Sequence, residues 1–549
     1  MAERGSPPLL PFAGLVAAGV LSFALLERLV VGLGRLPPAA YERAFFAPEI
    51  PARVAHLLRT RLSTAAVVAV VVLVALALAA DAVLARSAVR RRLAGVAAGW
   101  DAVEEGSALR WLVGAITGVA ALSLAAYPYN LYLDEAHLGD RLLVVALWGA
   151  LLWRPILALP FALVAGAVAH QFQQPLGSYS TTELELLLRV PILVGAWWIV
   201  RALVRDRRAD AFVFLLCCLM AVTWWSSGSG KLDVGWITHP YVHLLLLGAH
   251  ANGWLAGLST LAVERAAEVV RAVRVPMMLL TLAIECGSLL ALARRWTLVA
   301  FLTLTIAFHL GAFALTGILF WKWILVDVAL LAFLLREGRL GRLRIFGGWR
   351  LALAILFVVG QRAWIRAQDL TWFDTPLTYS IRLEGIDAAG GAHALPAGFF
   401  RPFAETFVLG TFPYLSPHPQ LTGPMGVTRS RPLAEALVAA RDPAAILALE
   451  RGALPRPDAQ LALRFDDFVA RSVRTANRLR AEGRLARPGV PRHLWTMPLD
   501  ADWPGRPAIV AVRVVEVTSF HDGRHLRAIR RRQLRTIVVE TGAARSPRR

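Results

Sequence analysis

Lys231 is the residue whose type and position most favour chemistry. It and Lys322 are the only lysines in the sequence, although the chain carries 59 lysines and arginines together. Arginine stays protonated in essentially any protein environment, whereas a lysine withdrawn from water can lose its proton and act as a base. The retained lysine therefore indicates a role for a neutral amine. The alternative is a lysine whose stem lies in the bilayer while its ammonium reaches the headgroups.

The residues around Lys231 are typical of a ligand site. Gly228 and Gly230 allow the backbone to leave a helix and a ligand to approach closely. Asp233 is placed to pair with the ammonium, and Trp236 is placed to wall the site on one side. A phosphate-binding P-loop is excluded, because its glycine spacing is absent and a leucine stands where the metal-binding hydroxyl is needed.

Ionisable residues also interrupt the later apolar runs. Glu285 and His309 each lie in the middle of one. Because ionisable groups are costly at that depth, they normally face an interior cavity and mark a site or a pathway. The alternative is a structural hydrogen bond between the two helices. Lys322 and Asp327, on the next run, are interpreted as a loose structural pair.

Three histidines precede these runs. His239, His243 and His250 would share one face of a helix beginning at Pro240, which is a geometry that metal ligands use. No carboxylate lies among them. We therefore interpret them as interfacial histidines and predict no metal site.

The composition indicates a membrane protein. The chain has 549 residues, of which 57% are hydrophobic, and a net charge of +21. Its arginines form short clusters between apolar runs and in the tail, a pattern that fits topology and anionic lipid contact rather than a nucleic-acid partner. The three cysteines all lie inside apolar runs and indicate no disulfide framework.

Apolar runs predict roughly ten or eleven membrane passes, because about 20 residues cross a bilayer. A charge and a proline at Arg154-Pro155 predict a helical hairpin in one of them. The predicted runs are 9–34, 64–85, 108–126, 142–169, 183–204, 211–225, 277–293, 298–316, 318–335 and 351–365.

The positive-inside rule gives a predicted orientation. The basic loop at 201–208 is placed in the cytoplasm, which puts Lys231 and the C-terminal third outside a cell membrane that the chain crosses several times. The segment 35–61 conflicts with this scheme, because it carries five arginines yet falls outside.

The composition changes near residue 369, where alternating runs at 379–383 and 508–515 predict strands. Helices are predicted at 432–449 and 461–482. The six arginines of 524–535 are interpreted as a solvated or lipid-headgroup face. The predicted fold is thus an α-helical polytopic membrane domain with a C-terminal α+β domain. Its divisions are N-terminal anchor helices (1–107), a central transmembrane domain (108–368) and an extracytoplasmic domain with an arginine-rich tail (369–549).

Two short motifs resemble a known family. Lys231-Leu232-Asp233-x-x-Trp236 resembles the Lys-Leu-Asp-x-x-Trp stretch of vitamin K-dependent gamma-carboxylases, and Phe308-His309 resembles a Phe-His pair of those enzymes. Residues 379–400 look like the family's strand, acidic-glycine turn and Leu-Pro-x-x-Phe run. The resemblance covers 108–403 and extends to the broader HTTM (horizontally transferred transmembrane domain) group.

The resemblance implies a carboxylase or epoxidase activity of the lyase type. In those enzymes a lysine deprotonates reduced vitamin K, oxygenation generates a strong base, a glutamyl side chain loses its γ-proton, and the carbanion adds CO2. Carried over, Lys231 is the base, supported by His309 and Asp233, while Trp236, Phe308 and Glu285 surround the cofactor. The implied partners are the lipid bilayer, reduced vitamin K or another quinol, and a glutamyl-containing protein.

The chain departs from the family at several positions. Gly230 stands where the animal enzymes have a second lysine, Gly177 stands where they have a histidine, and no cysteine pair can link the two domains. One alternative is a non-catalytic HTTM-fold protein that binds lipid or quinone or serves as a scaffold. Another is a small-solute transporter with Glu285 and His309 as a proton relay, which the absence of a visible repeat disfavours.

Overall fold

The computed structural model describes residues 9–34, 94–126, 138–170, 176, 185–365, 367, 370–395, 397–400, 404–483, 495 and 507–539. The predicted span at 64–85 lies outside these residues, as does Gly177.

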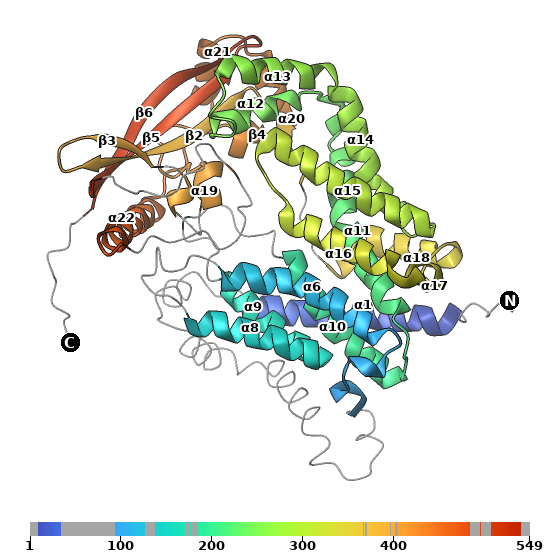
Figure 1. The fold of residues 1–549 in the computed structure, drawn as a ribbon. Helices are drawn as coiled ribbons and strands as arrows, with labels where there is room; N and C mark the ends of the chain where they lie inside the picture. Colours follow the sequence, from blue (N-terminus) through green and yellow to red (C-terminus); the bar gives the residue numbers. More distant parts are fainter. Residues whose placement is uncertain are drawn as a thin grey trace.

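Five helices of the first half pack against one another around an apolar core (Figure 1). They are α1 (Leu9–Gly34), α6 (Gly106–Ala125), α8 (Leu138–Trp153), α9 (Ala158–His170) and α10 (Glu185–Val204). The predicted hairpin is present, because α8 ends at Trp153 and Pro155 opens a short turn that leads back into α9. Proline ends the first helix since it has no N–H for the hydrogen-bond ladder.

The second group of helices carries most of the residues singled out above. It consists of α11 (Asp210–Asp233), α12 (His243–Ala251), α13 (Thr260–Ala272), α14 (Arg274–Gly287), α15 (Arg295–Thr316), α16 (Trp321–Leu335), α17 (Arg339–Arg342) and α18 (Gly348–Val359). Most residues of α11 are buried, which its nearly uninterrupted apolar sequence from Ala211 to Trp225 explains. The helices α14 and α18 pack against it, and Phe301 and Phe308 of α15 contact its Trp224.

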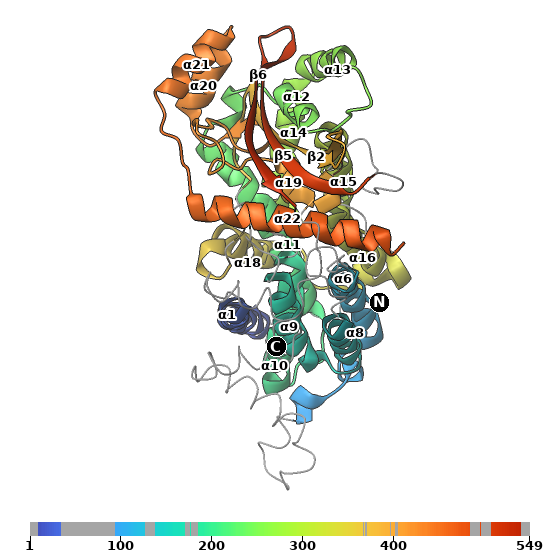
Figure 2. The same ribbon diagram turned by 90° about the vertical axis from the view of Figure 1, so that its left-hand side faces the viewer.

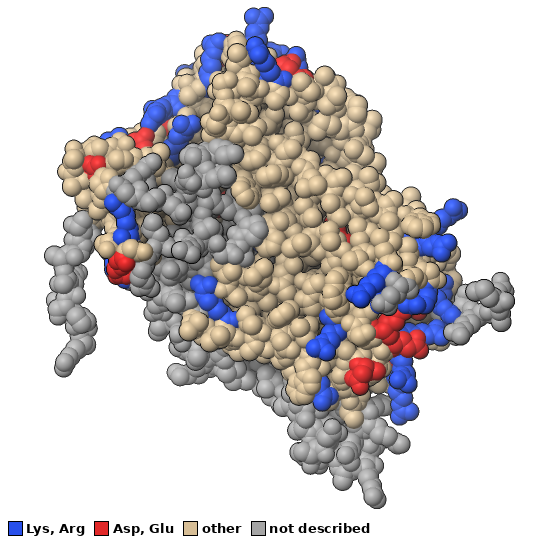
Figure 3. All heavy atoms as spheres, viewed as in Figure 1, with Lys and Arg blue, Asp and Glu red and all other residues tan. Residues whose placement is uncertain are grey.

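Five of the described helices are long and apolar enough to cross a membrane: α1, α6, α10, α11 and α15. A sixth crossing is formed if α13 and α14, which meet at a bend of 66°, count as one broken span. The coarse prediction of a helical membrane protein is therefore supported, whereas the finer one of about ten passes is not. The face in Figure 3 carries a broad uncharged surface over α14, α15 and α16, with Lys and Arg gathered toward its upper and lower right edges.

The C-terminal part is built on a small antiparallel sheet of order β3-β2-β5-β6. Its strands are β2 (Leu377–Asp387), β3 (Ala392–Leu395), β5 (Ile509–His521) and β6 (Leu526–Val538). A two-stranded ladder joins β1 (Phe373–Asp374) to β4 (Val427–Thr428). The helices around them are α19 (Ala404–Leu409), α20 (Arg431–Ala439), α21 (Pro443–Arg451) and α22 (Ala459–Ala481), and Figure 2 shows α22 crossing the molecule below the sheet.

Most predicted elements of this part are confirmed. Both predicted strands are present within β2 and β5, and the helix predicted at 461–482 is α22. The single helix predicted at 432–449 is wrong, because it is divided into α20 and α21. Asp442 accepts a hydrogen bond from the Ala445 amide and so caps a new helix, in which Pro443 occupies the first turn. The arginine-rich segment is the edge strand β6.

Candidate functional site

Lys231 lies in the last turn of α11, at the end that faces the C-terminal part. The expectation that Gly228 and Gly230 release the backbone from the helix is wrong, because α11 continues through both to Asp233. The residue that ends the helix is Gly235, whose φ of +67° lies in the left-handed region. Lys231 is therefore fixed on a rigid element rather than on a loop.

Gly228 has a different function, which is to let α14 approach. A Cβ atom at this position would lie 2.9 Å from both the Cβ of Glu285 and the Sγ of Cys286. Any side chain at residue 228 would thus push the two helices apart. The close approach brings Glu285 to Lys231, which lies three residues, or about one helical turn, beyond Gly228.

Lys231 and Glu285 form a buried ion pair. The Nζ of Lys231 lies 2.5 Å from Oε1 of Glu285, and the side chains are 9% and 4% exposed. The same Nζ lies 5.5 Å from the centre of the Trp236 ring, within the range of a cation–π contact. Removing two charges from water is costly unless geometry and further hydrogen bonds are good.

The C-terminal part places a second carboxyl near this pair. Asp374, on β1, is 4% exposed. Burial raises its pKa to about 7, an increase that a hydrogen bond from Trp372 and the positive charge of Lys231 reduce. The backbone carbonyl of Asp374 contacts Nε2 of His239 at 3.1 Å, and burial lowers the pKa of that imidazole. The ends of α11 and α14 and strand β1 thus together enclose one amine and two carboxyls.

His309, on α15, lies in an aromatic cluster beside the turn of α11 that carries Trp224. Its ring centre lies 5.1 Å from that of Trp224 and 4.9 Å from that of Phe320, with Phe308 and Trp323 at 6.1 and 6.3 Å. Trp224 precedes Lys231 by seven residues, so the two lie on the same face of α11 and about 10 Å apart along its axis.

The structure therefore brings together part of the predicted set. Lys231, Glu285 and Trp236 form one site, and Phe308 and His309 belong to the adjoining aromatic cluster. Asp233 is exposed, and the carboxylate that pairs with Lys231 is Glu285. The reason is helical geometry: residues two apart on a helix point to different sides.

The remaining polar groups serve other contacts. The carboxyl of Asp327 accepts a hydrogen bond from Thr305 on α15 at 2.9 Å. His250 contacts the carbonyl of Trp254 through Nδ1 at 3.0 Å. Among the described residues, no group of three or more histidines, cysteines or carboxylates is arranged to hold a metal ion.

Asp374 and the function of Gly228 were not anticipated from the sequence. Asp374 follows Lys231 by 143 positions in the printed sequence, and no local pattern in Trp372-Phe373-Asp374-Thr375 links the two. Gly228 could have been singled out as a small residue in an otherwise bulky helix, because small residues permit close helix contacts in membranes.

Models of known protein families, curated protein sequences and solved structures were all compared with this chain, and none of them matches it.

Proposed function

We propose that this chain is a membrane enzyme that removes a proton from a quinol-type lipid-soluble compound, with Lys231 as the base. The observation that carries the proposal is the buried Lys231–Glu285 pair with Asp374 beside it. A lysine amine, unlike a guanidinium, is a side chain that enzymes use as a base, and the two carboxyls beside it are groups to which a proton can be passed on.

The residues present fit a flat, aromatic compound. The rings around His309 come from α11, α15 and the segment that enters α16, and the Trp236 ring lies 5.5 Å from Nζ of Lys231. Aromatic side chains bind flat rings by offset or edge contacts. A bound quinol would supply the reducing equivalents for reaction with O2. The residues of this chain would orient it, keep water out and hold its hydroxyl proton at Nζ of Lys231.

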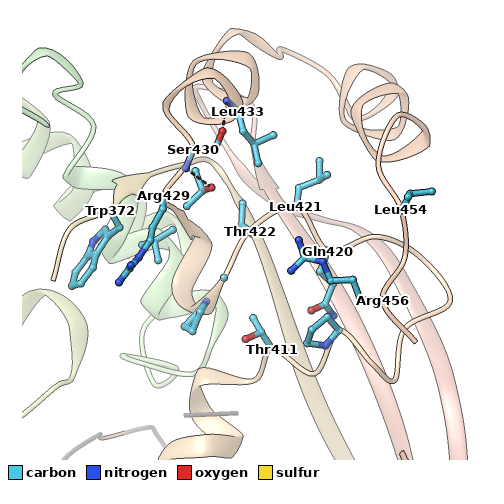
Figure 4. Close-up of a pocket in the computed structure, with 15 residues that line it drawn as sticks. Trp372, Thr411, Gln420, Leu421, Thr422, Arg429, Ser430, Leu433, Leu454 and Arg456 are labelled. Carbon is cyan, nitrogen blue, oxygen red and sulfur yellow. Dashed lines mark hydrogen bonds between the residues drawn. The ribbon is translucent and has the colours of Figure 1, made fainter. Parts of the chain in front are cut away.

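A cavity in the C-terminal part supports a site for a second substrate. It has a volume of about 590 Å³ and includes Trp372, whose indole hydrogen-bonds to Asp374. Figure 4 shows Trp372 and Arg429 at one end and Arg456 toward the other. Arginine recognises carboxylates through its planar fork of donors. We infer that a glutamyl-containing protein segment binds here, with its acidic side chain directed toward Asp374 and Lys231.

The experiment measures quinol-dependent epoxidation and CO2 incorporation by the purified full-length protein. Activity in the native protein, with loss in Lys231→Met at unchanged quinol binding, supports the proposal. An active Lys231→Met protein would exclude Lys231 as the base.

The second candidate is a protein that binds a quinone or lipid without chemistry. It is favoured by the aromatic cluster around His309, which lies about two helical turns from Lys231 and forms a ligand surface that does not require the ion pair. Tryptophan fluorescence quenching by a quinone tests it. Loss of quenching in Phe308→Ala, together with unchanged quenching in Lys231→Arg and no quinol-dependent activity in the native protein, would favour a protein that only binds.

A further inference from the structure

A second polar cavity lies apart from the Lys231 site. It has a volume of about 240 Å³ and is lined by residues of α12, of the corner between α13 and α14, of the segment that follows α20, and of the end of β5. Its charged residues and histidines are His243, Glu268, Arg271, Arg274, Arg441 and His521. Three guanidinium groups and one carboxylate therefore leave this cavity with an excess of positive charge.

The two histidines are buried in the walls of this cavity. His243 and His521 are each 8% exposed, and Nδ1 of His243 has no hydrogen-bond partner among the described residues. Burial and the charges of Arg271 and Arg274 lower the pKa of His243 to about 4, so its imidazole is neutral at pH 7. A neutral imidazole has one N–H to donate and one nitrogen to accept. A buried polar atom without a partner indicates a missing ligand or water.

The guanidinium groups are held in place around these histidines. Arg274 donates to the carbonyl of Arg271 at 2.6 Å, and Arg271 pairs with Glu268, which also lines the cavity. A Cβ atom on Gly523 would lie 3.4 Å from Nη1 of Arg441. The glycine in the β5–β6 turn, with φ of +95°, thus leaves room for Arg441 beside the end of β5.

We propose that this cavity binds a phosphate monoester group, as in the headgroup of phosphatidic acid or in free phosphate. Guanidinium groups match phosphate oxygens through paired donors, and a neutral imidazole adds a donor. The position favours a membrane lipid as the source. Arg274 begins α14, whose first two turns carry the exposed apolar residues Val275, Leu279 and Leu280. Figure 3 shows positive charge gathered above the uncharged band of this face.

The test uses the full-length protein purified in a neutral detergent. Binding of inorganic phosphate is measured by titration calorimetry, and binding of dioleoyl phosphatidic acid, against dioleoyl phosphatidylcholine, is measured by native mass spectrometry. The cavity variant is Arg271→Gln with Arg441→Gln. The matched control is Arg265→Gln with Arg524→Gln, which removes the same charge from exposed positions of α13 and the β5–β6 turn.

The proposal expects the cavity variant to weaken binding of phosphatidic acid at least tenfold, while the control leaves it unchanged. His521→Asn, which removes no arginine, is expected to weaken it severalfold, and a thermal melt confirms that each variant is folded. Binding of both probes indicates a general phosphate site, and binding of phosphatidic acid alone identifies the lipid as the source. The proposal would be overturned if the cavity variant and the control weakened binding of phosphatidic acid equally. It would also be overturned if the protein bound no inorganic phosphate and did not prefer phosphatidic acid to phosphatidylcholine.

Discussion

The ion pairs Arg189–Glu27 and Lys231–Glu285 both join described helices of the membrane part, and they differ in the cation. Arg189 of α10 pairs with Glu27 of α1 at 2.8 Å, and Lys231 of α11 pairs with Glu285 of α14 at 2.5 Å. All four side chains are at most 13% exposed. Each pair can hold two helices together. Arginine keeps its proton throughout the accessible pH range, whereas lysine is a residue that proteins also use as a base.

The surroundings of the two pairs sharpen this difference. The lysine pair lies where the C-terminal part covers the ends of α11 and α14, and Asp374 and Trp236 are next to it. The arginine pair lies between α1 and α10, two helices that pack along each other in the membrane part. We therefore interpret Arg189–Glu27 as a structural pair and Lys231–Glu285 as an acid–base pair.

The largest expected effect is the loss of a single cation. Lys231→Met removes the cation that pairs with the buried Glu285, and Arg189→Met removes the cation that pairs with Glu27. Each change should lower the free energy of unfolding by about 3–5 kcal/mol, because a buried carboxylate loses its ion-pair partner. Thermal and denaturant unfolding in detergent measure the cost. A clear cost at Arg189 without one at Lys231 would mean that the lysine pair contributes little to the fold.

The pH dependence of stability probes the second carboxyl of the lysine site. Burial raises the pKa of Asp374 to about 7 from 3.8, so the folded protein keeps a proton that the unfolded chain has released. The free energy of unfolding should therefore fall as the pH rises from about 4 to 7, by at most about 4 kcal/mol, and then level off. Asp374→Asn should remove this slope. An unchanged slope in that variant would show that Asp374 titrates normally.

Lys231→Arg separates the role of Lys231 as a base from that of its positive charge. Arginine preserves the positive charge and can still pair with Glu285, but it cannot supply a free amine. We expect a folded protein with quinol-dependent activity reduced by about 10²–10⁴-fold, the usual contribution of a general base. A variant as active as the native protein would support the non-catalytic alternative.

The smallest expected effect concerns the glycine that brings the lysine pair together. Gly228→Ala places a Cβ 2.9 Å from Glu285 and Cys286, so we expect a loss of about 1–3 kcal/mol from overpacking. Gly311→Ala on α15 is the control, because an added Cβ there meets no atom within 4 Å. Differential scanning calorimetry compares the melting temperatures of the two variants. Equal melting temperatures would mean that α14 can shift without strain.

The sequence predicts those parts of the fold that depend on a local pattern of residues. The first helix, the hairpin at Pro155 and strands β2 and β5 follow from apolar runs, a helix breaker and alternation. The sequence predicts that this helix ends at 225, because the serines and glycines of 226–230 favour a break, but tertiary packing keeps the stretch helical to Asp233.

The site was predicted in part for the same reason. Lys231 and Glu285 were each recognisable as ionisable groups next to or within apolar runs, yet their contact depends on the close approach of α11 and α14. The prediction that Asp233 pairs with Lys231 rests on their nearness in sequence. It fails because residues two apart on a helix point to different sides. Asp374 reaches the site only through the fold of the C-terminal part, which no sequence pattern specifies.

The most direct test replaces both members of each pair by apolar residues. Lys231→Met with Glu285→Leu is compared with Arg189→Met with Glu27→Leu, because such double replacements remove both charges of a pair and are often tolerated. We predict that both proteins fold, that the arginine-pair variant keeps quinol-dependent activity, and that the lysine-pair variant has none. Retained activity in the lysine-pair variant would contradict the assignment of Lys231 as the base.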